Sequence, residues 1–110
     1  MSGDVVPLTH GGLDEDTGLL WRALADPTRR RILDLLRERP RVTGEIAAQF
    51  PISRIAVMRH LDVLSQAGLV ISRKRGRQRW HYLNTVPLQK LHQRWADPAA
   101  AGFASALLRL

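Results

Sequence analysis

The spacing of proline, glycine and helix-capping residues restricts the fold of this chain more than any other sequence feature. Asp26 is a favourable N-cap, and Pro27 follows it at the first helical position, where a missing N–H is tolerated. We therefore predict a helix over residues 28–39, which Pro40 ends. Its apolar face consists of Ile32, Leu35 and Leu36. Leucine and alanine residues at helical spacing from Gly18 onward predict a preceding helix that ends at Asp26.

The next two predicted helices lie close together in the sequence. Thr43 begins the first, where its hydroxyl can cap free amides, and Glu45 suits the positive end of the helix dipole. The residues that this helix is expected to bury are Ile46, Ala47 and Phe50. Pro51 prevents its continuation, and Ser53 caps a longer helix that ends at Gly68. Two helices joined by about three residues, the second longer and better capped, are typical of a helix-turn-helix.

The predicted helix over residues 53–67 has two different faces. At 100° per residue, Val57, Leu61 and Leu64 fall on one narrow seam, which we expect to be buried. The residues on or beside the opposite face are Arg54, Ile55, Met58, Arg59, Asp62 and Gln66. Solvent exposure alone does not favour isoleucine and methionine beside arginines, so this face is interpreted as a binding surface. The alternative is that Ile55 or Met58 packs on a neighbouring helix.

After Gly68 the pattern changes to two β-rich runs, which include Leu69 to Ile71 and Trp80 to Leu83. They flank a basic segment centred on Gly76, and this arrangement predicts a β-hairpin. Five residues of the hairpin are basic and none is acidic, namely Arg73, Lys74, Arg75, Arg77 and Arg79. A merely solvated turn normally mixes charge signs, so the hairpin is expected to bind phosphate groups.

These elements predict a mainly α-helical fold with a small β-hairpin, that is, a winged helix-turn-helix with about five helices and a two-stranded wing. The predicted domain covers residues 18–96 and ends with a helix from Pro87 to Trp95. Residues 1–17 are interpreted as a flexible acidic leader, because they contain four acidic residues and no helical pattern. Residues 97–110 form an alanine-rich tail that could be helical.

The charge of the chain points to an anionic partner. The sequence has 17 Lys and Arg against 10 Asp and Glu, a net charge of +7, and four of the acidic residues fall within the first eighteen positions. A folded part this basic usually meets nucleic acid, although a generally solubilising surface is the alternative. Cysteine is absent, which excludes disulfides and thiolate metal sites.

Other classes of protein find little support in the sequence. No glycine-rich phosphate loop, nucleophile elbow or pair of carboxylates beside a histidine is present, so no enzyme activity is expected. No apolar run is long enough to span a membrane and no signal peptide is recognised, so a cytoplasmic protein is predicted. A winged helix used for protein or RNA contact, without operator specificity, stays an alternative.

A helix with this outer face can enter the major groove of duplex DNA while the basic hairpin lies along the backbone or minor groove. Arg54 and Arg59 are candidates for bidentate contact with guanine, and Ile55 and Met58 for contact with thymine methyl groups. The helix starts at Ser53 and at Thr43 are candidates for phosphate binding.

Three segments carry a resemblance to a known family: LADPTRRRIL at 24–33, ISRIAVMRHL at 52–61 and AGLV at 67–70. Over about residues 19–95 the chain resembles the ArsR-type (arsenic-resistance repressor) winged helix-turn-helix transcriptional regulators. The resemblance implies a dimeric bacterial repressor that binds a palindromic operator. It places Arg54, Ile55, Met58, Arg59 and His60 at the positions that read DNA. The relatives often have serine or another small residue where this chain has Ile55 and Met58.

The metal-sensing branch of this family has cysteine near the position of Thr43, or Asp and His pairs on its last helix. This chain has neither, and its four histidines include no pair four residues apart. We therefore expect no bound metal and no cofactor. The segment FPISRIAVMR at 50–59 looks most similar to a branch of the family that does not sense metals.

Dimerisation has its own sequence signal. Two groups of apolar residues, near the start and the end of the predicted domain, exceed what a monomer of this size can enclose. They are Leu19, Leu20, Trp21 and Leu24, and Leu88, Leu91 and Trp95. A two-fold symmetric pairing of two chains would bury them, and the alternative is that they complete the core of a single chain.

Overall fold

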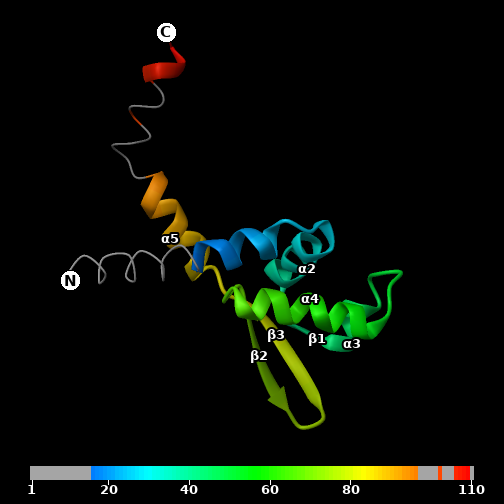
Figure 1. The fold of residues 1–110 in the computed structure, drawn as a ribbon. Coiled ribbons are helices and arrows are strands. Elements are labelled where there is room, and N and C mark those ends of the chain that lie inside the picture. The colour runs from blue at the N-terminus through cyan, green and yellow to red at the C-terminus, as the bar shows by residue number, and fades with distance from the viewer. Residues whose placement is uncertain (1–15, 97–101, 103–105, 110) are drawn as a thin grey trace, which may run out of the picture.

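The computed structural model describes residues 16–96, 102 and 106–109 (Figure 1). Residues 16–24 are helical and lead into α2 (Pro27–Glu38), β1 (Arg41–Val42), α3 (Thr43–Ala47) and α4 (Arg54–Gln66). The strands β2 (Val70–Arg75) and β3 (Gln78–Leu83) and the helix α5 (Val86–Trp95) complete the order. Most of the predicted leader and of the alanine-rich tail lies outside the described residues. The helix is already formed at residue 16, two positions before its predicted start.

The helix α2 begins and ends where its capping residues predict. Asp26 has an extended backbone, and its Oδ2 accepts a hydrogen bond of 3.1 Å from the amide of Arg29, while Pro27 takes the first helical position. The side chains of α2 that enter the core are Ile32, Leu33 and Leu36. The predicted apolar face is therefore wrong in one residue, because Leu35 is only half-buried and Leu33 takes its place.

The helix-turn-helix is formed by α3 and α4. The α3 helix ends at Ala47 rather than near Phe50, so the connection to α4 is longer than the predicted three residues. The α4 helix has the predicted cap, since the Oγ of Ser53 accepts a 3.1 Å hydrogen bond from the amide of Ala56. The chain leaves α4 through Gly68, whose φ of 76° lies in the left-handed region that glycine adopts without strain.

One hydrophobic core joins these helices to the base of the hairpin. Val57, Leu61 and Leu64 form the buried seam of α4, as predicted, and complete burial of such a side chain contributes about 1.5–3 kcal/mol. The other core residues are Leu20, Ala23, Ile32, Leu33, Leu36, Ile46, Leu69 and Val70. The seam therefore fixes the rotation of α4 about its axis, and the opposite face is turned outward.

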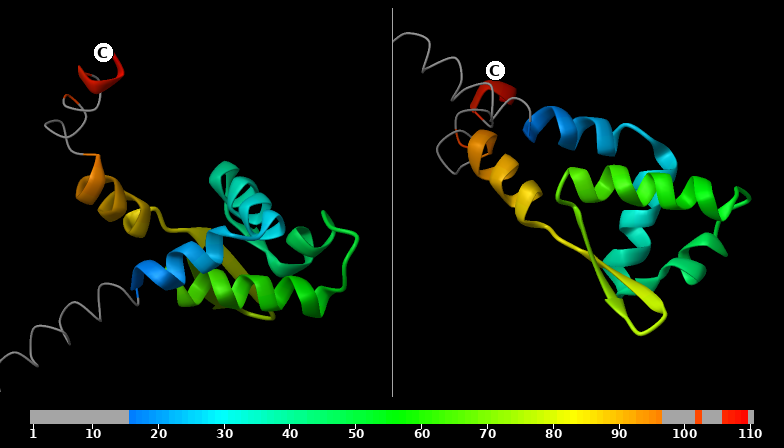
Figure 2. Two further views of the ribbon diagram at one scale, coloured as in Figure 1. Left: turned by 45° about the horizontal axis from the view of Figure 1, so that its top comes forward. Right: turned by 60° about the horizontal axis from the view of Figure 1, so that its bottom comes forward.

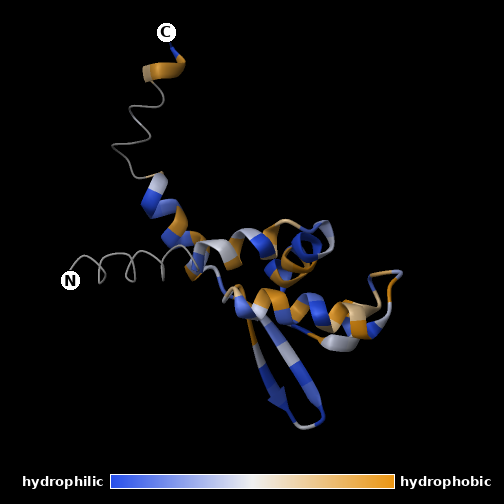
Figure 3. Ribbon diagram, viewed as in Figure 1, coloured by the Kyte–Doolittle hydropathy of each residue, from blue (hydrophilic) through white to orange (hydrophobic). Residues whose placement is uncertain are grey.

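The sheet has three antiparallel strands in the order β1-β3-β2, not the two strands predicted. The hairpin itself is confirmed, with Val70 opposite Leu83 and Arg75 opposite Gln78. The additional strand β1 contains only two residues and pairs with the base of β3. Figures 1 and 3 show the tip of the hairpin, which is strongly hydrophilic, extending away from the helices.

The two ends of the domain lie side by side. Both views in Figure 2 show the helix of residues 16–24 running along α4, with α5 next to the start of this helix. The rings of Trp21 and Trp95 stack with centroids 6.2 Å apart and planes inclined by 8°. Within the described part of the chain, no helix has the length and apolar character needed to cross a membrane.

Candidate nucleic-acid interface

The outer face of α4, defined here as Arg54, Ile55, Met58, Arg59, Asp62 and Gln66, is open to solvent along its length. Ile55 is 63% exposed and Met58 is 49% exposed. The alternative that these two residues pack on a neighbouring helix is therefore wrong for the single chain. This face combines guanidinium donors with apolar side chains, which are the groups needed to contact base edges and thymine methyl groups.

The start of α4 and the hairpin share a concave surface. A cavity of about 310 Å³ opens between them, and its lining includes Arg54 and Met58 from α4 and Arg77 and Arg79 from the hairpin. A second hollow of about 660 Å³ follows α4 toward β2 and is lined in part by Met58, Arg73 and Arg79. Residues that are more than 20 positions apart in the sequence are thus brought to one surface.

The register of the hairpin divides its basic residues between two faces. Lys74 is directly opposite Arg79, so both side chains project from the same face as the buried His81. Arg73 and Arg75 project from the other face, and Arg77 is in the turn. Only part of the predicted basic set therefore faces the side where α3 and α4 lie.

Basic residues of the hairpin repel one another. Like charges directly opposite each other on adjacent strands are destabilising, and Lys74 and Arg79 form such a pair. Among the residues that the structure describes, the ion pairs involve none of the five basic residues of the hairpin. An anionic partner would relieve this repulsion.

A buried histidine attaches the base of the hairpin to α3. His81 is only 3% exposed, and its ring is hydrogen-bonded to Thr43 Oγ1 at 2.8 Å and to Ser72 Oγ at 2.7 Å. In the neutral ring one nitrogen donates and the other accepts, so one hydroxyl is an acceptor and the other a donor. Burial and the nearby charge of Arg79 lower the pKa of His81 from its usual value of 6.5.

This arrangement corrects the prediction for Thr43. The predicted cap is not formed, because no side chain caps α3 and the hydroxyl of Thr43 is hydrogen-bonded to His81 instead. Thr43 is 7% exposed, so its hydroxyl is not free to bind a phosphate group. His81, which sequence reasoning did not assign to the site, is the residue that orients the hairpin. Its position within a β-run gave no such signal.

We expect the stability of the protein to fall when the pH is lowered below about 6.5, the usual pKa of histidine. Because the folded state favours neutral His81, the unfolded chain binds more protons in this range, and the free energy of unfolding rises with pH. The stabilisation is complete above the unfolded pKa and is lost as the pH falls through the folded one. Chemical denaturation at several pH values between 7 and 5 measures this slope.

Two variants identify the histidine responsible. His81→Asn should flatten the slope between pH 7 and 5, whereas His92→Gln, at an exposed position of α5, should leave it unchanged. An equal slope in wild type and His81→Asn would show that His81 is not the titrating group.

His60 also lies elsewhere than predicted. Its side chain is only 23% exposed, and its Nδ1 is 3.2 Å from a guanidinium nitrogen of Arg29. The ring is thus turned toward α2 rather than toward the outer face of α4. This contact supports packing between helices, the other role considered for His60, over its predicted role in reading DNA.

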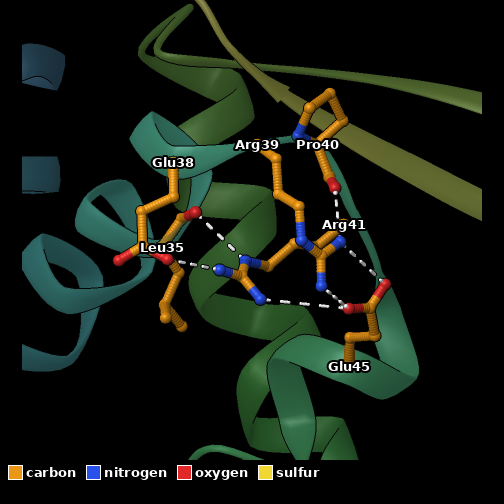
Figure 4. A network of polar contacts seen from close by, with 6 residues as sticks. All are labelled: Leu35, Glu38, Arg39, Pro40, Arg41 and Glu45. Carbon is orange, nitrogen blue, oxygen red and sulfur yellow. Dashed lines mark hydrogen bonds and ion pairs between the residues drawn. The ribbon is translucent and has the colours of Figure 1, made fainter.

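A polar network around Arg41 connects the end of α2 to the start of α3 (Figure 4). The guanidinium of this buried residue donates to the carbonyl of Leu35 at 3.0 Å and to Glu38 at 2.7 Å. It also lies 3.9 Å from the carboxylate of Glu45, to which Arg39 donates two hydrogen bonds. Hydrogen bonding to Arg39 lowers the pKa of Glu45. The network fixes α3 against α2, and the sequence analysis did not predict it.

The residues expected at a dimer interface fall into three groups. Leu20 is 4% exposed and belongs to the core of its own chain, so its assignment to an interface is wrong. Leu19, Leu24, Leu88 and Leu91 are half-buried. Trp21 and Trp95 are 48% and 54% exposed, and together they form an apolar surface on the helix of residues 16–24 and on α5.

The donors needed for a metal site are not clustered in the part of the chain that is described. No group of three or more His, Cys, Asp or Glu side chains there could hold a metal ion. The chemistry of the site is therefore carried by its cations and its exposed apolar side chains.

A helix-turn-helix whose second helix is exposed next to a basic β-hairpin defines a winged helix-turn-helix protein. Comparisons with known proteins agree. A helix-turn-helix domain family matches residues 24–73. The transcriptional repressor SdpR of Bacillus subtilis is 40% identical over 70 residues, which cover 64% of this chain and 78% of the repressor. The HTH-type transcriptional regulator Rv2034 of Mycobacterium tuberculosis is 41% identical over 87 residues, which cover 76% and 81% of the two chains.

Solved structures show the same relationship. The ArsR-like transcriptional regulator from Rhodococcus sp. RHA1 aligns with a TM-score of 0.72 and 28% identity, over 89% of this chain and 92% of that one. The homodimeric winged helix-turn-helix DNA-binding domain of Mb0332 from Mycobacterium bovis aligns with a TM-score of 0.67 and 26% identity, over 74% and 76%. The chain belongs to the ArsR-type family of winged helix-turn-helix transcriptional regulators.

Proposed function

We propose that two copies of this chain pair and bind a palindromic operator in duplex DNA as a cytoplasmic transcriptional repressor. In each copy α4 enters the major groove and the hairpin follows the neighbouring backbone. The observation that carries the proposal is the shared concave surface of α4 and the hairpin, where Arg54, Met58, Arg77 and Arg79 line one cavity. Among the described residues these arginines have no ion-pair partner, and positive charge of this kind beside an exposed reading face is suited to phosphates and bases together.

Within this surface the residues have different tasks. The exposed side chains of Arg54 and Arg59 would form bidentate hydrogen bonds to guanine, and those of Ile55 and Met58 would contact thymine methyl groups. Ser53 and the free amides at the start of α4 hold a phosphate. The hairpin contributes affinity with little sequence preference. Thr43 and His60 are not part of this set, because their polar groups are engaged inside the protein.

Pairing of two chains is supported by the surface around Trp21 and Trp95. The dimer surface, defined here as Leu19, Trp21, Leu24, Leu88, Leu91 and Trp95, combines half-buried leucines with two exposed aromatic rings. A two-fold pairing through it would set two α4 helices about one turn of DNA apart, roughly 34 Å. The homodimeric state of the Mycobacterium bovis domain supports the same assembly.

Selection of bound sequences from a random duplex pool tests the proposal. We expect the protein to enrich one palindrome, and Arg59→Ala to relax the preference at one position of each half-site by about 1–3 kcal/mol. Arg37→Ala, which removes an exposed arginine of α2 away from the site, serves as the control and should select the wild-type palindrome. Enrichment of no sequence by the wild-type protein would contradict operator binding and favour a protein- or RNA-binding module.

A further inference from the structure

Arg29 connects two parts of the molecule that have separate roles in the proposed function. Its Nε donates to the carbonyl of Ala23 at 2.9 Å and one terminal nitrogen donates to the carbonyl of Arg22 at 2.7 Å. The other terminal nitrogen lies 3.2 Å from Nδ1 of His60 in α4. One guanidinium group thus joins the end of the helix of residues 16–24 to α4.

The chemistry of this joint requires an arginine and an acceptor on α4. The carbonyl groups at the end of a helix have no partner within the helix, and Arg29 caps two of them. A guanidinium group can only donate, so Nδ1 of His60 accepts and the proton of the neutral ring is on Nε2. The fork geometry of arginine reaches all three acceptors at once, which the point charge of lysine does not.

The first turn of α2, which carries Arg29, is itself fixed. The Oδ2 of Asp26 accepts from the amide of Arg29 at 3.1 Å and lies 3.9 Å from Nδ1 of His60. The neighbouring Arg30 donates to the carbonyl of Leu24 at 2.7 Å, at the end of the same helix. Arg30 is exposed, and no hydrogen bond or ion pair connects it to α4 among the described residues. The contact to α4 is therefore made by Arg29 and not by its neighbour.

The contact between Arg29 and His60 lies next to a residue that is proposed to read DNA. His60 directly follows Arg59 in α4, whereas Trp21 and Leu24 of the dimer surface lie in the helix that Arg29 caps. We propose that Arg29 is a positioning residue that fixes α4 relative to the dimer surface and thereby selects the spacing of the two DNA half-sites. The inference rests on the proposed function, because half-site spacing has meaning only for a paired DNA-binding protein.

The experiment measures the binding of the full chain to duplexes that carry the selected half-sites at different separations. The separation is the preferred one, or one or two base pairs shorter or longer, and a duplex with a single half-site is included. Loss of simultaneous engagement lowers avidity, so we expect wild type to prefer one separation by about 10²-fold. Arg29→Met should reduce this preference to a few-fold, while its affinity for the single half-site stays near that of wild type.

Matched variants separate positioning from general stability. Arg30→Met removes a cap from the same helix but no contact to α4, and should keep the spacing preference. His60→Asn places an amide oxygen close to where Nδ1 accepts and should also keep it, whereas His60→Leu should lose it. If Arg29→Met fails to fold, the two His60 variants decide the question.

The outcomes distinguish this inference from the function on which it rests. If Arg29→Met and His60→Leu weaken every duplex equally and keep the wild-type preference for one separation, Arg29 is merely structural and the inference is overturned. If the wild-type chain binds duplexes of all separations equally, the paired binding of DNA fails, and the inference is overturned with it.

Discussion

Replacing Lys74, Arg77 and Arg79 together with glutamine is expected to lower the affinity for duplex DNA by about 10²- to 10³-fold for each bound chain near 0.1 M salt. Each phosphate contact releases condensed counterions, so the slope of log affinity against log salt should become shallower by about 0.9 per contact, or roughly 2.7 in total. Fluorescence anisotropy with random duplex DNA over a range of salt concentrations measures both quantities.

The register of the hairpin supplies the matched control. Arg75 is on the face opposite Lys74 and Arg79 and, unlike Arg73, lines neither of the two hollows beside α4, so the variant Arg75→Gln removes charge from the same hairpin but from the face away from α3. We expect its salt slope to change by less than one unit. Equal losses in the two variants would show that net charge matters and orientation does not. A wild-type affinity that does not respond to salt would favour the protein- or RNA-binding alternative.

The triple variant should lose affinity for DNA without losing stability. The triple variant removes the like-charge pair formed by Lys74 and Arg79, and such cross-strand pairs account for roughly 0.2–1 kcal/mol. The triple variant is therefore expected to be as stable as wild type or slightly more stable in chemical denaturation. Weaker binding of a protein that is at least as stable would exclude unfolding as the cause of the lost affinity.

Local signals in the sequence predicted those elements that local interactions determine. Asp26 and Ser53 cap α2 and α4 with bonds to residues three positions away, and the seam of α4 follows from helical periodicity alone. The exposure of Ile55 and Met58 followed from the same periodicity, because the opposite side of a helix with a narrow buried seam faces outward. These features account for most of the outer face of α4.

Hydrogen bonds between residues that are distant in the sequence were not predicted. Thr43 and His81 are 38 positions apart, and Arg29 and His60 are 31 positions apart. Neither hydrogen bond leaves a pattern in the sequence, so the hydroxyl of Thr43 and the ring of His60 were both predicted to contact DNA. The strand β1 has only two residues and forms because β3 lies next to it, so no alternation could indicate it. Tertiary contacts therefore decided the roles that composition and spacing left open.

The dimer surface gives the second large effect. Trp95→Glu is expected to convert the protein into a monomer and to reduce its affinity for the palindromic duplex by about 10²- to 10⁴-fold, since two linked half-sites gain avidity of this order. Trp95 is more than half exposed and contacts Trp21 and Arg94, so a single chain does not need it for its core. Tryptophan is common among the residues that dominate interface energetics, and burial of a carboxylate in its place would cost desolvation free energy.

Sedimentation and DNA binding together check this result. Gln93→Glu adds the same charge to α5 at an exposed position, about 160° around the helix from Trp95 by the 100° rotation per residue. This control should sediment as a dimer and bind the palindrome like wild type. Affinity for a single half-site should be the same in both variants and in wild type, because α4 and the hairpin are unchanged. A Trp95→Glu protein that still sediments as a dimer would place the pairing surface elsewhere on the molecule, and the spacing of the two α4 helices would then no longer depend on the joint made by Arg29.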